Sequence, residues 1–255
     1  MKKLLLFIVS CLLLSSCSSL IEMALERKGI FDEKAKLDIL SNEDKKIVII
    51  GMHHIGKQSF YDDVRFKVDS LRNLGFDFLY ETIKYDSDFP KEQQNLYDMK
   101  FRKFLGLHIG KEGYFDTITN KIAGRVKVDK EHKLVNQPRY HKLGVDSLID
   151  TKADLPKNIL IDKFETKYGV IELEECDYNT PLGETYKCTI WKKRDKNRSE
   201  MNNYLIQDIR NEEIVNKIVN SKNNNIAVIY GKNHIEGVTK LLQKQDSTWV
   251  KINTN

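Results

Sequence analysis

Two short motifs of the same form, Gly-x-x-His, lie near opposite ends of the chain. They are Gly51-x-x-His54 and Gly231-x-x-His234, and a third polar residue, Glu81, follows an apolar run between them. Two imidazoles and one carboxylate are enough protein ligands for a catalytic divalent metal with open coordination positions. The residue types therefore predict a metal site of His54, Glu81 and His234 if the fold brings them together. Such ligands discriminate poorly among Mn, Co, Zn and Fe.

Each of these polar residues follows a run that predicts a buried strand. Residues 46–50 and 225–230 are continuous apolar runs, and residues 76–80 form a third that ends at Glu81. Apolar residues at helical spacing predict a helix over 57–73, which gives a strand–helix–strand unit. Ligands gather at the carboxyl ends of strands in open α/β sheets, so we expect the motifs to share one sheet edge.

The rest of the chain predicts alternating helices and strands. We expect an α/β fold, with an α+β variant as the alternative. A mixed, largely parallel central sheet would carry helices on both faces, plus a small inserted hairpin region. The further elements expected are helices at 20–27, 91–105, 114–122, 157–168, 198–221 and up to residue 243, a hairpin within 169–193, and short strands at 134–137 and 247–252.

Arg210 lies within the apolar face of the helix expected over 198–221. Ile206 and Ile214 stand four residues before and after it, so the guanidinium is expected to be buried. A buried arginine needs a partner, such as a carboxylate, a metal-bound anion or a substrate group. A purely structural salt bridge is the alternative. Asp154 is a further acidic group that could reach the same cleft.

The ordered set of motifs resembles the TraB/PrgY/GumN group, which contains the TIKI proteins. The residues that carry the resemblance are Gly51-x-x-His54, Glu81, the pair Arg210-Asn211, and Gly231-x-x-His234. The group is distantly related to ChaN-like haem-binding lipoproteins and to erythromycin esterases. The resemblance spans about residues 46–240, with an unmatched insertion at about 124–195.

This resemblance implies a mixed α/β fold and metal-dependent peptide hydrolysis. The implied metal, Mn, Co or Zn, would be held or flanked by His54, Glu81 and His234, one of which could instead act as general base. Glu81 and Arg210 would be catalytic, with Arg210 stabilising negative charge on the substrate. The implied substrate-binding residues are Arg210, Asn211, Gly51 and Gly231, and the ligand is a peptide or small molecule.

Two other functions remain open. A ChaN-type lipoprotein would bind haem, iron or a small ligand in the same cleft, although no Cys-x-x-Cys-His attachment site is present. A non-catalytic interaction protein of the cell envelope is the third candidate. The sequence contains no Gly-x-Ser-x-Gly elbow, Walker loop or His-Glu-x-x-His motif, which argues against several common hydrolase and nucleotide-binding classes.

The N-terminus predicts a bacterial lipoprotein. Two lysines precede an apolar run over 4–14, and Leu-Ser-Ser-Cys17 resembles a lipobox. The run is shorter than the roughly 20 residues that span a bilayer. We therefore expect a signal peptide over 1–16, a membrane lipid anchor on Cys17 and a tether over 17–45. Ser18 favours the outer membrane, facing the periplasm.

The remaining chain, residues 46–252, is expected to form one domain. Cys176 and Cys188 lie in a predicted oxidising compartment, so a disulfide is expected between them, with two free thiols as the alternative. The formal net charge of +5 is a mild excess for a chain of this length and does not favour nucleic-acid binding.

Overall fold

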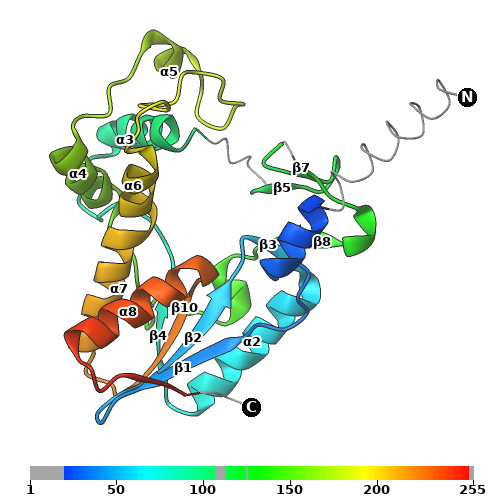
Figure 1. Ribbon diagram of the computed structural model, residues 1–255, viewed down its shortest axis with the longest axis vertical. Coiled ribbons are helices and arrows are strands. Elements are labelled where there is room, and N and C mark those ends of the chain that lie inside the picture. The colour runs from blue at the N-terminus through cyan, green and yellow to red at the C-terminus, as the bar shows by residue number, and fades with distance from the viewer. Residues whose placement is uncertain (1–19, 107–112, 125, 253–255) are drawn as a thin grey trace, which may run out of the picture.

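The computed structural model describes residues 20–106, 113–124 and 126–252. Its main sheet contains six strands: β1 (Leu37–Ser41), β2 (Lys46–Met52), β4 (Asp77–Tyr80), β9 (Thr151–Lys152), β10 (Asn225–Gly231) and β11 (Val250–Ile252). Their order across the sheet is β11-β1-β2-β10-β4-β9 (Figure 1). β10 is parallel to β2 and β4, and β9 is parallel to β4, whereas β1 and β11 form an antiparallel edge.

Helices cover both faces of this sheet because the central strands are apolar on both sides. They are α2 (Gln58–Asn73) on one face, and α7 (Ile209–Asn220) and α8 (Ile235–Gln245) on the other. In β2, Val48 and Ile50 pack into the cluster that contains α2, whereas Ile47 and Ile49 pack into the cluster of α7 and α8. Successive strand residues point to opposite faces, so a continuous apolar run fills both cores.

A separate helical region packs around its own apolar core. Its helices are α3 (Lys91–Leu105), α4 (Lys157–Tyr168), α5 (Glu175–Asn179) and α6 (Arg198–Asn203), and its core includes Phe104, Phe164 and Trp191. α6 continues through a π-helical segment, η3 (Tyr204–Asp208), into α7. This long helix joins the two regions, since Leu205 packs in the helical core and Ile214 in the sheet core (Figure 1).

Short strands and the N-terminal segment form a third, smaller cluster. The strands are β3 (Ile55–Lys57), β5 (Phe115–Asp116), β6 (Lys121–Ile122), β7 (Val126–Lys127) and β8 (Leu134–Asn136). Short 3₁₀ turns occur at η1 (Lys130–His132), η2 (Tyr140–Leu143) and η4 (Lys232–His234). Residues 20–27 are helical, and Leu25, Ile30 and Phe31 pack against Ile55 and Phe115.

The α/β class is confirmed, with a mostly parallel central sheet and helices on both faces. The helices predicted at 91–105 and 157–168 are confirmed with the same bounds, and the one at 198–221 ends one residue earlier, at Asn220. The three strands expected to end at the motifs are also confirmed. In the sheet, β10 lies between β2 and β4.

The helix predicted at 114–122 is wrong, because this segment forms the hairpin of β5 and β6. The Asp116 side chain accepts hydrogen bonds from the backbone N–H groups of Ile118 and Thr119. Such bonds offer the backbone an alternative to helical pairing. Asn120 and Ala123 adopt positive φ angles of 55° and 47°, which also end any helix.

The hairpin predicted within 169–193 is also wrong, since this segment contains α5 and turns. Glu174 and Asp177 form a capping box that starts α5. The structure does contain the disulfide, with 2.03 Å between the sulfurs of Cys176 and Cys188. The cysteines therefore close a helical loop instead of joining two strands.

The tether predicted over 17–45 is too long, because residues 37–41 form β1 in the main sheet. Leu40 is fully buried and pairs with Ile47. The predicted signal peptide and Cys17 lie outside the described residues. Among the described helices, none combines the length and the apolar character needed to cross a membrane.

Candidate functional site

The motifs predicted to share one sheet edge do so. Gly51 pairs with Tyr230 across β2 and β10, and Tyr80 pairs with Ile229 across β4 and β10. Because all three strands are parallel, the segments that follow them leave the sheet side by side. His54, Glu81 and Arg210 line a cavity of about 1040 Å³, and the same three residues line an adjoining cavity of about 610 Å³.

Arg210 holds two carboxylates at the base of this site. Its Nη2 donates to Glu81 Oε1 at 2.7 Å, and its Nε donates to Asp154 Oδ1 at 2.7 Å. The residue is only 5% exposed. Burial lowers the pKa of the guanidinium, but the charges of Asp154 and Glu81 outweigh it and raise the pKa above its usual value. Arg210 is therefore a permanent buried cation that fixes the position of Glu81.

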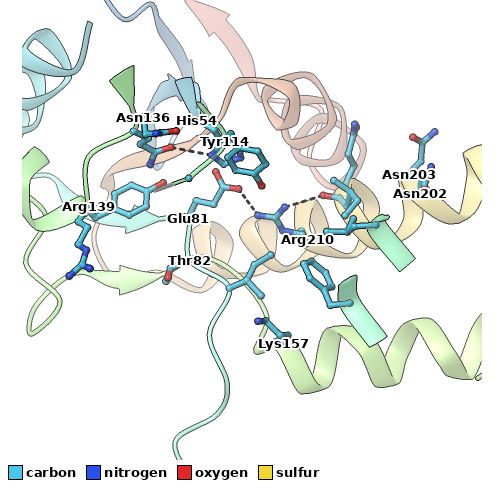
Figure 2. Close-up of a pocket in the computed structure, with 18 of the residues that line it drawn as sticks. His54, Glu81, Thr82, Tyr114, Asn136, Arg139, Lys157, Asn202, Asn203 and Arg210 are labelled. Atoms are coloured by element: carbon cyan, nitrogen blue, oxygen red, sulfur yellow. Dashed lines mark hydrogen bonds and ion pairs between the residues drawn. The ribbon is translucent and has the colours of Figure 1, made fainter. Parts of the chain in front are cut away.

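Glu81 is held on its other side by the second Gly-x-x-His motif. The backbone N–H of Gly231 donates to Glu81 Oε2 at 2.8 Å. A Cβ on Gly231 would lie 3.2 Å from that oxygen, so glycine allows the backbone to approach the carboxylate closely. Figure 2 shows Glu81 between His54 and Tyr114 on one side and Arg210 on the other.

His234 is buried behind this cluster and is neutral at ordinary pH. Its Nδ1 lies 2.7 Å from Asn211 Oδ1, and its Nε2 lies 3.5 Å from Arg210 Nη1. Because an amide oxygen only accepts, Nδ1 carries the hydrogen and the Nε2 lone pair faces the guanidinium. Burial and the nearby Arg210 charge lower the pKa of His234 to about 3.

His54 differs from His234, since it is exposed and faces both cavities. Its Nδ1 lies 3.3 Å from Gln137 Oε1, and its ring stacks on Tyr114 with 4.8 Å between centroids. The Gln137 backbone N–H also donates to the His54 carbonyl at 2.9 Å. Because Gln137 Oε1 only accepts, the contact requires a hydrogen on Nδ1, and the lone pair on Nε2 can accept a proton.

The three predicted metal ligands do not fit a metal ion in this arrangement. Both oxygens of Glu81 accept hydrogen bonds, and His234 directs its free lone pair at the cation of Arg210. Within the described residues, no group of three or more His, Cys, Asp or Glu side chains has metal-site geometry. One buried carboxylate oxygen, Asp154 Oδ2, has no hydrogen-bond partner among the described residues, but a single oxygen is not a ligand set.

The residues predicted to bind substrate also contact other groups of the protein. Asn211 is 4% exposed and contacts His234, while Arg210 contacts the two carboxylates. A Cβ on Gly51 would lie 2.9 Å from Ile235 Cδ1, so this glycine packs closely against the end of the Ile235 side chain. Arg210 lines both cavities and Gly231 lines the smaller one, so their predicted contact with substrate stays a prediction.

Several residues of the site were not identified from the sequence. Gln137, Tyr114 and Tyr140 line the larger cavity, and burial raises the pKa of both phenols, so they stay protonated. Tyr114 lies in the segment predicted as a helix, Gln137 ends a predicted short strand, and Tyr140 lies in a stretch without a predicted element. The sequence Leu-Val-Asn-Gln, predicted as a short strand, was the one signal that placed Gln137 near a strand end.

No family model, curated protein or solved structure matches this chain. The resemblance to the TraB/PrgY/GumN group stays a prediction from the motif residues.

Proposed function

We propose that this protein is a hydrolase of acyl bonds, with peptides as the substrate class, anchored in the cell envelope through Cys17. The observation that carries the proposal is His54, an exposed imidazole oriented by Gln137 in the wall of a cavity of about 1040 Å³. A positioned imidazole with a free lone pair is the usual general base.

In the proposed reaction, His54 Nε2 takes a proton from water, and the resulting hydroxide forms a bond to the substrate carbonyl carbon. When the tetrahedral intermediate collapses, the bond to the leaving amine breaks and His54 returns the proton to the nitrogen. Glu81 lines the same cavity as His54 and is held there by Arg210 and the backbone of Gly231. Arg210 is a positioning residue, because its Nη2 donates a hydrogen bond to Glu81 Oε1 and holds the carboxylate in place.

The developing oxyanion needs hydrogen-bond donors in the same cavity. The phenols of Tyr114 and Tyr140 fit this role, because both line the cavity and burial raises the pKa of each. A preorganised donor of this kind is worth about a hundredfold or more in rate. No step of this mechanism passes through a metal ion.

Haem binding is the second candidate, and one observation favours it. His54 Nε2 and the Tyr114 and Tyr140 phenols are iron ligands of the types that hold haem, and they face a large, partly apolar cavity. Titration with haemin would give a Soret shift that His54→Ala removes. A flat titration argues against this function.

The hydrolase proposal is tested by incubating the purified protein, residues 20–255, with a randomised peptide library and counting new termini by mass spectrometry. Cleavage that persists in excess EDTA is the expected result. Cleavage lost in EDTA and restored by Mn or Co would support the metal-dependent form implied by the family resemblance. A folded protein that cleaves no peptide contradicts the proposal and leaves the ligand-binding and interaction functions.

A further inference from the structure

The larger cavity extends along one face of the long helix. Its wall includes side chains at four-residue intervals over 198–210, which places them on one helical face. In order from the helical region to the sheet, the helix residues that line the cavity are Arg198, Asn202, Asn203, Ile206, Gln207 and Arg210. Figure 2 shows Asn202 and Asn203 farther along this helix from Arg210.

Arg198, at the far end of this face, is a cation without a carboxylate partner in the described part of the chain. It donates to the backbone carbonyls of Trp191 and Phe104, and its guanidinium lies 4.1 Å from the centroid of the Phe104 ring. These contacts fix the side chain but leave its charge uncompensated. Arg198 is half-buried, and this burial lowers the pKa of its guanidinium.

The other charged residues of the cavity divide into paired and unpaired groups. Lys157 pairs with Asp98 at 2.6 Å, and Arg210 pairs with Glu81 and Asp154. Arg139, on the opposite wall, forms no ion pair with any described residue and is exposed. The cavity therefore carries an excess of positive charge that a ligand can neutralise, with Arg198 as the best fixed of the unpaired cations.

The separation along the helix sets the length of a fitting ligand. Position 210 is twelve residues beyond position 198, which corresponds to about 18 Å at 1.5 Å per residue. An extended peptide covers this distance with about five residues at roughly 3.3 Å each. The amides of Asn202, Asn203 and Gln207 line the intervening stretch and can pair with the backbone of such a peptide.

We infer that the cavity binds an extended peptide along this helix, with its C-terminal carboxylate paired to Arg198 and a backbone carbonyl about five residues away facing His54. A carboxylate–guanidinium pair is charge-assisted and can be bidentate. This inference deepens the proposed function and rests on it for the position of the reacting bond.

The test compares two randomised pentapeptide libraries that differ only in a C-terminal carboxylate or amide. Binding is measured by equilibrium dialysis and mass spectrometry, using the His54→Ala variant, which retains Arg198 and is expected not to cleave the library. We expect the carboxylate library to be retained about tenfold better than the amide library, in keeping with a loss of about 1.4 kcal/mol on amidation. Equal retention, or retention of neither library, overturns the inference.

Arg198→Gln should remove the preference for the carboxylate, whereas Arg194→Gln should keep it. Arg194 is exposed, lies four residues before Arg198 and does not line the cavity. Arg194→Gln therefore makes the same change in charge outside the cavity. If Arg198→Gln does not fold, the comparison of libraries on the His54→Ala protein still decides the inference. If the wild-type protein cleaves both libraries but His54→Ala retains them equally, the proposed function is supported and this inference is refuted.

Discussion

At the residue scale, the site depends on one buried guanidinium. Arg210 contacts Glu81, Asp154, the carbonyl of Ile206 and the ring of His234, and it comes from a helix that also carries the cavity wall. The carbonyl of Ile206 belongs to the π-helical segment η3, and Arg210 Nη1 donates to it at 3.3 Å. Such segments are frequent at functional sites. Here the segment lies directly before the residue that orders the site.

Replacing this cation should destabilise the fold. Arg210→Met leaves the carboxylates of Glu81 and Asp154 without their shared cation, and the Asp154 side chain is fully buried. We therefore expect the free energy of unfolding to fall by about 3–5 kcal/mol. Urea unfolding of wild type and Arg210→Met measures this difference in the free energy of unfolding. Arg65→Met is the matched control, since Arg65 is exposed on α2 and lies 3.9 Å from Asp69. Equal effects of the two substitutions would show that the buried cluster is not needed for stability.

Acid should destabilise the protein through His234. Its pKa is lowered from 6.5 to about 3, so between these values the unfolded chain binds a proton that the folded chain does not. Stability is therefore fully present above pH 6.5 and falls as the pH drops, by about 1.4 kcal/mol per pH unit. Burial lowers the pKa of His53 from 6.5 to about 4. His53 therefore adds a similar loss of stability over a shorter pH range.

The measurement is urea unfolding of wild type and His234→Gln at pH 7, 5.5 and 4.5. The substituted protein should show a shallower dependence on pH, because one of the two buried histidines no longer titrates. Identical pH dependence in both proteins contradicts the assignment of His234 as a buried neutral imidazole.

At the element scale, continuous apolar runs made the sheet predictable. β2 and β10 are so strongly apolar that their type, their burial and the edge at which their motifs meet follow from the pattern alone. The helix predicted over 114–122 is wrong because the Asp116 side chain accepts hydrogen bonds from the backbone. The spacing of apolar residues does not indicate such bonds. β1 was missed because only Leu40 of its five residues is buried.

Only part of the candidate site could be predicted, because only some of its residues follow strands that the sequence indicates. The shared edge of Gly51, Glu81 and Gly231 depends on strands that the sequence reveals. The partners of His54 depend on Gln137 and Tyr114, which come from irregular segments whose course is set by tertiary contacts. Arg210 was correctly expected to be buried with a partner, but the choice among carboxylate, metal-bound anion and substrate needed the fold.

The disulfide should stabilise the helical region. Cys176 and Cys188 close a short loop, and Asp177 beside them pairs with Lys103, which is 2% exposed. Replacing both cysteines by alanine should cost about 3 kcal/mol, the amount expected from closing a loop of this size. Urea unfolding of this variant should match that of the reduced wild type. An unchanged midpoint would show that the ion pairs suffice to hold the loop.

At the scale of the whole molecule, the cavity is lined by residues of the helical region, such as Phe101, and by Glu81 at the edge of the sheet. The N-terminal segment packs beside the same region through Leu25, Ile30 and Phe31. Arg27, Lys28 and Ile30 of this segment also line the adjoining smaller cavity.

Substituting the expected lipid attachment site should release the protein. Cys17→Ser in the full chain should shift it from the membrane fraction to the soluble fraction, because the acyl chains supply the membrane affinity. Mass spectrometry of the wild-type N-terminal peptide should show diacylglycerol on Cys17. A membrane-bound Cys17→Ser protein would contradict lipid anchoring at this residue.

The central claim is that His54 activates water in this cavity. The most direct measurement is ¹⁸O incorporation into new peptide carboxyl groups in H₂¹⁸O, comparing wild type with His54→Ala and with His141→Ala, an exposed histidine outside the cavity. We expect His54→Ala to lower the rate by about a hundredfold to ten-thousandfold without changing the melting temperature, and His141→Ala to leave both unchanged. Equal ¹⁸O incorporation by wild type and His54→Ala, or none by any of the three proteins, would contradict the claim.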